Sequence, residues 1–263
     1  MSVIRLHDKD RIEAFLRKNV YLHIYGIGDL DDFFWPDTIW YGWEEKGEIQ
    51  AIVLLYTASD DPTILALSEQ QDVMLELVQS LFHVFPERFY AHMSPEVAGA
   101  VERQYKTEFH GKHYKMGLMN KASLREVDCS NVIRLTENDL EDMLGLYKEG
   151  YPGNWFNPRM LQTKQYFGIR LKNHLVSVAG VHVYSEKYKV AALGNIITHP
   201  DYRGRGFAKA VTAALCQSLL ENVDDIGLNV KAANTAAVAM YRKLGFEIAA
   251  TYYELMVLGH SSE

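Results

Sequence analysis

The sequence predicts an α+β fold, an α/β sandwich of two consecutive units, each a mixed, mostly antiparallel sheet flanked by helices. Two observations support this prediction. Segments rich in β-branched and aromatic residues alternate with segments whose apolar residues recur at helical spacing. The order of these segments in residues 1–128 is then repeated in residues 129–263. A chain of 263 residues can hold two ordinary domains, so we expect an N-terminal domain at 1–128 and a C-terminal domain at 129–263.

In the first half, the signals begin with a helix that Asp8 or Asp10 can cap, because apolar residues at helical spacing follow. The segment 21–35 is aromatic and acidic and matches no single pattern. The further elements expected are a hairpin of strands 39–44 and 49–56, a strand at 63–67, a helix from Asp72, a strand at 88–92, a helix after Pro95 and a strand at 114–119.

The second half repeats this order with clearer signals. Thr136 and Asp139 have the spacing of a capping box at the start of a helix. Further helices are expected from Pro158, after the turn 203–208, and from Asn234 to just before Gly245. Strands are expected at 132–135, 167–171, 175–184, 190–198, 226–230 and 247–257.

Charge and cysteine content exclude several classes of function. Residues 1–128 hold 21 acids and 13 bases and residues 129–263 hold 13 acids and 14 bases, without the clustered Lys and Arg that nucleic-acid binding needs. The chain has 2 cysteines and neither a C-x-x-C nor an H-E-x-x-H spacing, so we expect no metal site and a reducing compartment. Charged residues occur throughout the segment before Asn19, and no apolar run reaches about 18 residues. We therefore expect a cytoplasmic protein without a membrane segment.

The segment from Arg203 to Ala208 predicts an anion-binding turn. Gly204 and Gly206 have no Cβ to obstruct a ligand, and the helix that follows directs unpaired N–H groups and the positive end of its dipole outward. Arg203 and Arg205 add forked donors that suit phosphate oxygens. The turn is neither a Rossmann fingerprint nor a P-loop, because the third glycine and the G-K-S/T ending are missing.

Two motifs in this half resemble the GNAT superfamily of acyl-CoA-dependent N-acyltransferases. The segment 203–208 matches its pattern of Gln or Arg, two residues, Gly, one residue, and Gly or Ala. The segment 234–246 is similar to its second signature, N-x-x-A-x-x-x-Y-x-x-x-G-F. The resemblance covers about residues 130–258. The first half resembles the family only in the order of its elements, and residues 69–72 hold neither glycine nor arginine, so we expect a degenerate GNAT-like half that binds no pyrophosphate.

The resemblance implies a binding site for acetyl-CoA and a residue for each part of it. The pyrophosphate would lie on the turn, contacted by Arg203, Gly204, Arg205, Gly206, Phe207 and Ala208. The pantetheine arm would add to the strand at Ile196, Ile197 and Thr198 and contact Asn234, although an ordinary helix N-cap explains Asn234 equally well. Tyr241 would donate a proton to the departing thiolate; the alternative is a core residue.

One position departs from the family pattern. Many members carry a glutamate on the strand before the turn, whereas this chain has Asn195, which cannot act as a base. We expect Asn195 to take part in catalysis by holding a water through which the amine loses its proton. His182 and Glu149 are the other candidates for the base.

The expected reaction is direct attack of a primary amine of a small molecule on acetyl-CoA, that is, N-acetyl transfer. One alternative is transfer of a longer acyl group to an amino acid such as glycine. The other is a non-catalytic acyl-CoA sensor, because Asn195 is no base and the first half is degenerate. Tyr151, Trp155 and Phe156 either shape the acceptor pocket or pack between the two halves.

Overall fold

The computed structural model describes residues 2–260 and confirms the predicted α+β fold. The chain forms two compact units. Unit 1 contains the residues up to Lys115, Val230–Asn234 and the residues from Ile248 onward; unit 2 contains Met116–Asn229 and Thr235–Glu247. Each unit therefore includes a piece of the other half of the sequence. The division into domains at 1–128 and 129–263 stays a prediction.

Unit 1 is a mixed sheet with helices on its faces. Its strands follow the order β1-β2-β3-β4-β5-β12-β6, in which β4 and β5 are parallel, while the other pairs from β1 to β5, and β5 with β12, are antiparallel. The elements are β1 (Ser2–Leu6), α1 (Lys9–Leu16), α2 (Val20–Asp29), β2 (Thr38–Glu45), β3 (Glu48–Tyr56), β4 (Thr63–Ala66), α3 (Gln71–Leu81), β5 (Phe89–Met93), α4 (Pro95–Gln104), β6 (Tyr105–Leu118) and part of β12 (Phe246–His260).

Local signals account for most of these elements. Asp8 caps α1 as expected, since its side chain accepts hydrogen bonds from the backbone N–H groups of Asp10 and Arg11. The segment that matched no pattern contains α2, which Asn19 caps. Helix α2 is deeply buried and carries apolar residues on several of its sides. A helix of this kind lacks the 3.6-residue hydrophobic period that marks a surface helix.

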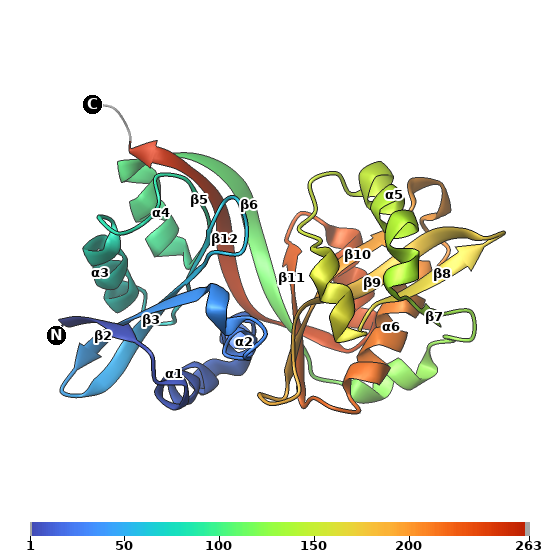
Figure 1. Cartoon of the computed structure of the whole chain (residues 1–263), viewed down its shortest axis with the longest axis horizontal. Helices are drawn as coiled ribbons and strands as arrows, with labels where there is room; N and C mark the ends of the chain where they lie inside the picture. Colours follow the sequence, from blue (N-terminus) through green and yellow to red (C-terminus); the bar gives the residue numbers. More distant parts are fainter. Residues whose placement is uncertain (1, 261–263) are drawn as a thin grey trace. The chain divides into compact units, whose positions relative to one another are not determined.

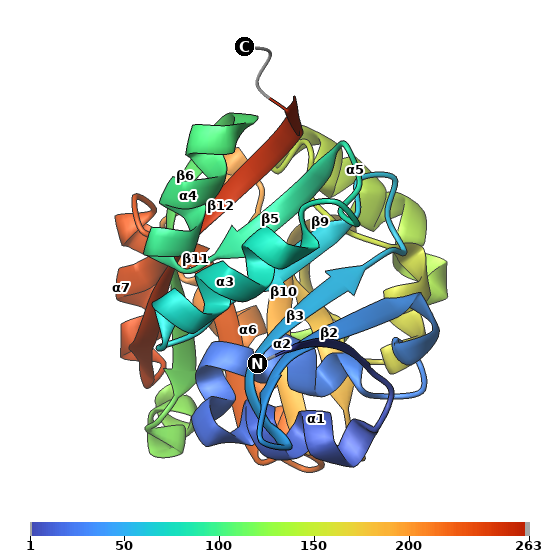
Figure 2. The same cartoon turned by 90° about the vertical axis from the view of Figure 1, so that its left-hand side faces the viewer.

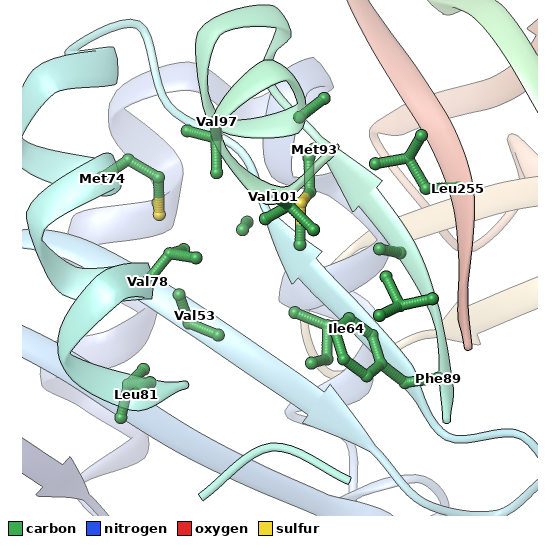
Figure 3. Close-up of a cluster of buried hydrophobic side chains, with 14 of the residues drawn as sticks. Val53, Ile64, Met74, Val78, Leu81, Phe89, Met93, Val97, Val101 and Leu255 are labelled. Atoms are coloured by element: carbon green, nitrogen blue, oxygen red, sulfur yellow. The ribbon is translucent and has the colours of Figure 1, made fainter. Parts of the chain in front are cut away.

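The core of unit 1 lies between the sheet and the pair α3 and α4, which both lie in front of the sheet in Figure 2. Figure 3 shows side chains of both helices pointing toward those of β3, β4, β5 and β12, among them Val53, Ile64, Met74, Phe89 and Leu255. Alternate residues of each strand face this core, as the period of 2 in a strand requires. The intervening residues of β5 and β12 face the opposite side of the sheet.

Unit 2 is built on the same plan. Its strands follow the order β11-β10-β9-β8-β7, with β10 and β11 parallel and the others antiparallel, and α5 and α6 pack on the two faces of this sheet (Figure 1). The helix expected from Pro158 is present as a 3-10 helix, Pro158–Thr163. The other elements are β7 (Ile133–Arg134), α5 (Leu140–Gly150), β8 (Phe167–Leu171), β9 (His174–Ser185), β10 (Val190–Thr198), α6 (Phe207–Leu219), β11 (Asp225–Lys231) and α7 (Thr235–Lys243).

A glycine in β9 leaves room for a buried ring. A Cβ on Gly180 would lie 2.1 Å from Cε1 of Tyr166, whose fully buried ring is anchored by a hydrogen bond to the carbonyl of Val181 at 2.9 Å. We expect Gly180→Ala to lower the free energy of unfolding by about 1–3 kcal/mol. Gly145→Ala in α5 is the control, because a Cβ there meets nothing within 4 Å and helix propensity favours alanine by up to about 1 kcal/mol. Urea denaturation measures the free energy of unfolding of both variants. Equal losses of this free energy in the two variants would contradict the packing of Tyr166 on Gly180.

Candidate active site

The turn before α6 has the geometry of an anion-binding loop. Gly204 and Gly206 have φ angles of +77° and +83°, a region that side chains disfavour, and a Cβ on either would meet nothing within 4 Å. Gly206 is the N-cap of α6 and no side chain caps the helix in the described structure. The backbone N–H groups of the first helical turn, at Phe207 and Ala208, therefore face open space at the positive end of the helix dipole.

The two arginines of this turn contact backbone carbonyls. Arg203 donates hydrogen bonds to the carbonyls of Thr198 at 3.2 Å and Gly150 at 3.3 Å, which ties the turn to the ends of β10 and α5. Arg205 donates to the carbonyl of Asp201 at 3.4 Å and is exposed. The hydrogen bonds of Arg203 therefore fix the shape of the turn. The backbone N–H groups of Phe207 and Ala208 are the groups placed to bind an anion.

Beside the turn, β10 parts from β11 and bulges against β9. Its parallel ladder with β11 ends at the pair Leu193 and Leu228. Its register with β9 shifts between Gly194 and Ile197, which marks a β-bulge. The segment 196–198 follows the bulge and reaches the turn through the hydrogen bond from Arg203 to Thr198. The structure thus brings together the two segments from which the resemblance predicts a cofactor site.

Asn195 lies at the centre of the bulge, with a φ of +54° and 3% exposure. Tyr147 donates to its carbonyl oxygen at 3.0 Å, and its Nδ2 donates to Oη of Tyr166 at 3.1 Å. Tyr166 has one hydroxyl proton and donates it to the carbonyl of Val181, so its oxygen must accept from Asn195, which fixes the orientation of the amide. The amide oxygen Oδ1 is buried and has no hydrogen-bond partner among the described residues. A ligand or a water with an N–H or O–H group would complete it.

Aromatic side chains surround this bulge. The ring of Phe156 lies 5.1 Å from that of Tyr147 and 5.6 Å from that of Tyr166. Burial raises the pKa of both tyrosines above 10, so both stay protonated. Tyr151 and Trp155, on the same loop as Phe156, are each 46% exposed. Tyr147 and Tyr166 are not predictable as site residues from the sequence, because neither belongs to a motif; the apolar helical face that includes Tyr147 is the only signal.

Tyr241 lies on α7, 7% exposed, with its ring edge-on to Phe246 at 5.9 Å. Burial, with smaller contributions from Cys216 and Tyr151, raises its pKa above the ordinary value of 10, so the phenol holds its proton across the physiological range. Burial raises the pKa of the Cys216 thiol in the same surroundings.

Asn234 directly precedes α7 and belongs to the segment Val230–Asn234 of unit 1. Its backbone N–H donates to the carbonyl of Lys231 at 2.9 Å, and the residue is exposed. Both of its expected roles, contact with pantetheine and N-cap, stay predictions.

The two other candidates for a base differ in their surroundings. Oε2 of Glu149 lies 2.9 Å from Nε2 of His199, whose Nδ1 accepts a hydrogen bond from the N–H of Asp201, so Nε2 carries the proton that faces the carboxylate. Glu149 is thus an exposed carboxylate that accepts a hydrogen bond from His199. His182 is half-buried next to the bulge, since its ring fills the space over Gly194, where a Cβ would lie 1.9 Å from its Cδ2.

The corresponding region of unit 1 lacks these features. The ladder between β4 and β5 runs the whole length of β4 without a register shift, and the N-cap of α3 is Gln70, not glycine. An open, acidic hollow lies at the start of α3. It is lined by Glu69, Gln70, Gln71, Asp72, Val73 and Glu96. Carboxylates at this place repel a pyrophosphate, in line with the expectation for the first half.

Residues 2–260, which the structure describes, contain no group of three or more His, Cys, Asp or Glu residues placed to hold a metal ion. None of the described helices is long and apolar enough to cross a membrane.

Comparisons with known proteins bear on unit 2 and on the whole chain. Residues 132–246 match the model of the acetyltransferase (GNAT) family. An acetyltransferase of Yersinia pestis is 42% identical over 50 residues, which are 19% of this chain and 36% of the relative. The match therefore spans about a third of the length of that relative.

Two solved structures resemble the whole chain. A GNAT-family acetyltransferase from Colwellia psychrerythraea has a TM-score of 0.60 and 15% identity, covering 98% of this chain and 99% of that one. A tandem GNAT protein from the clavulanic acid biosynthesis pathway has a TM-score of 0.57 and 12% identity, covering 99% of each chain. At these identities the likeness concerns the fold alone.

Proposed function

We propose that the protein transfers an acetyl group from acetyl-CoA to a primary amine of a small molecule, with residues 132–246, which match the acetyltransferase (GNAT) family model, as the transferase domain. The observation that carries the proposal is the open glycine turn at the start of α6 next to the bulged strand β10. A turn of this kind suits a pyrophosphate, and a strand that parts from its neighbour suits an amide-bearing arm.

The residues present fit coenzyme A as a substrate. The amides of Phe207 and Ala208 would bind its pyrophosphate, with Gly204 and Gly206 allowing the close approach and Arg205 able to turn toward the phosphates. The backbone of residues 196–198 would pair with the pantetheine arm. When bound, acetyl-CoA supplies the thioester that the amine attacks.

Tyr241 and Asn195 would manage the protons of this reaction. Tyr241 stays protonated and would donate its proton to the sulfur as the thioester bond breaks. Oδ1 of Asn195 would accept a hydrogen bond from the attacking amine or from a water that takes its proton, because it is a buried acceptor that has no donor among the described residues. His182, over Gly194, is the neighbouring group to which that water could pass the proton.

The alternatives differ in what they predict for turnover. The presence of Asn195 in place of a carboxylate favours the non-catalytic acyl-CoA sensor. The tandem layout resembles that of transferases that join longer acyl groups to amino acids such as glycine, which favours the second alternative. A thiol-release assay with acetyl-CoA and a panel of small amines, repeated with longer acyl-CoA donors and glycine, separates the three. Amine-dependent release from acetyl-CoA supports the proposal. Release only from longer donors, or none at all, contradicts it.

The number of cofactor sites is a further prediction. Because unit 1 presents carboxylates where unit 2 presents a glycine turn, we expect calorimetric titration of the full chain with CoA to show one site per chain. A second saturable site that persists in a Gly206→Val variant would contradict the degenerate character of the first half.

A further inference from the structure

The direction of the side-chain amide of Asn195 decides what this residue offers to a ligand. The amide carries an acceptor, Oδ1, and a donor, Nδ2, of nearly the same size, so a half turn exchanges the two. In the bulge of β10 the residue is 3% exposed, and Oδ1 has no hydrogen-bond partner among the described residues. Only this direction leaves an acceptor for the N–H of an amine or the O–H of a water. Whatever fixes the direction of the amide is therefore part of the site.

The hydroxyl group of Tyr166 selects this direction. Its proton goes to the carbonyl oxygen of Val181 at 2.9 Å, and a carbonyl oxygen can only accept. The hydroxyl oxygen then offers lone pairs alone, and it accepts from Nδ2 of Asn195 at 3.1 Å. After a half turn of the amide, Oδ1 would face this oxygen with no proton between them. Two buried acceptors in contact are unfavourable, so this hydrogen bond favours one direction of the amide.

The ring of Tyr166 is held in place and does not follow a turning amide. It is 0% exposed, and it fills the space over Gly180, where a Cβ would lie 2.1 Å from Cε1 of the ring. The ring of Phe156 packs edge-on against it at 5.6 Å. The packing of the ring and the bond to the carbonyl of Val181 together make the hydroxyl oxygen a fixed point.

A second tyrosine holds the backbone of the same residue. Tyr147, on α5, donates its proton to the backbone carbonyl oxygen of Asn195 at 3.0 Å. The φ of Asn195 is +54°, a conformation that asparagine adopts more readily than most residues. Tyr147 thus contacts the main chain and Tyr166 the side chain. Loss of the Tyr166 hydroxyl therefore frees the amide while the bond from Tyr147 to the bulge stays.

We propose that Tyr166 is a positioning residue for acetyl transfer, because its hydroxyl group keeps Oδ1 of Asn195 directed toward the amine or the water that takes its proton. This inference rests on the proposed function, in which Asn195 has that part. Tyr166 makes and breaks no covalent bond in the reaction. It acts through Asn195, so its effect on turnover must vanish when the side chain of Asn195 is absent.

A double-mutant cycle on turnover tests this dependence. The cycle compares the full-length wild type with Tyr166→Phe, Asn195→Gly and the double variant, and glycine suits the positive φ of residue 195. With acetyl-CoA and an amine that the wild type acetylates, we expect Tyr166→Phe to lower kcat about tenfold and to leave KM for acetyl-CoA within about twofold. Asn195→Gly lowers kcat at least as much, and the double variant is no slower than Asn195→Gly. A wild-type kcat in Tyr166→Phe, or a double variant slowed by the product of the two losses, would overturn the role of Tyr166.

NMR separates a failure of this inference from a failure of the proposed function. In ¹⁵N-labelled protein, the side-chain N–H pair of Asn195 is identified by its loss in Asn195→Gly and reports the bond to Tyr166 without turnover. We expect the shifts of this pair to move in Tyr166→Phe and to stay in Tyr184→Phe, whose lost hydroxyl binds Glu186 near the end of β9. An unmoved pair in Tyr166→Phe would overturn the positioning whatever the turnover. A moved pair without amine-dependent thiol release by the wild type would show the amide oriented as described and would overturn the proposed function, and with it the catalytic purpose of that orientation.

Discussion

Replacing Tyr241 by Phe is expected to lower turnover by about 10²- to 10⁴-fold while leaving the affinity for CoA almost unchanged. The phenylalanine keeps the ring and its edge-on contact with Phe246, so the packing of α7 survives. It removes the one transferable proton of this buried side chain. The thiol-release assay measures turnover, and calorimetry on the same sample measures CoA affinity.

A second tyrosine of unit 2 provides the control. Tyr184 donates a hydrogen bond to Glu186 at 2.6 Å on the strand β9, so Tyr184→Phe loses a hydrogen bond without touching the proposed site. We expect it to cost about 1 kcal/mol of stability at most and to leave turnover close to wild type. A Tyr241→Phe protein with the turnover and pH profile of the wild type would make Tyr241 a core residue and leave water as the proton donor.

Gly206→Val is expected to weaken CoA binding by well over tenfold, a loss of about 1.4 kcal/mol or more. The valine would place a branched side chain on the surface that the pyrophosphate must approach, and it would strain a backbone with a φ of +83°. Calorimetric titration of the folded variant with CoA measures the loss.

The strain itself needs a matched control. Gly47, in the turn between β2 and β3, has a φ of +86° and, like Gly206, open space around a built Cβ. Gly47→Val therefore carries the same backbone penalty away from the glycine turn, and we expect its CoA affinity to equal that of wild type. An unchanged affinity in Gly206→Val, or equal losses in both variants, would show that the turn does not bind the pyrophosphate.

The secondary structure was predictable wherever a local signal marks an element. The cap at Asp8, the hairpin turn at Lys46 and Gly47 and the capping box at Thr136 all mark ends that the structure has. Helix α2 was not predictable, because a helix buried on several sides carries no amphipathic period. The placement of β12 beside β5 was not predictable either, because pairing between distant strands leaves no trace in local sequence.

The candidate site divides in the same way. The glycine turn and the signature containing Tyr241 are contiguous motifs, so the sequence alone predicts them. Tyr147 and Tyr166 contact Asn195 only because α5 and the residues before β8 meet at a bulge of β10, and that meeting depends on tertiary structure.

The central claim is that an acetyl group passes from acetyl-CoA to an amine on this protein. The most direct test incubates the wild-type chain with acetyl-CoA labelled with ¹³C in the acetyl group and a cellular metabolite extract, and follows the label by mass spectrometry. We predict that the label moves to the nitrogen of one or a few small amines and that Tyr241→Phe slows this transfer. Label that stays on CoA, or is released only as free acetate, would contradict the claim.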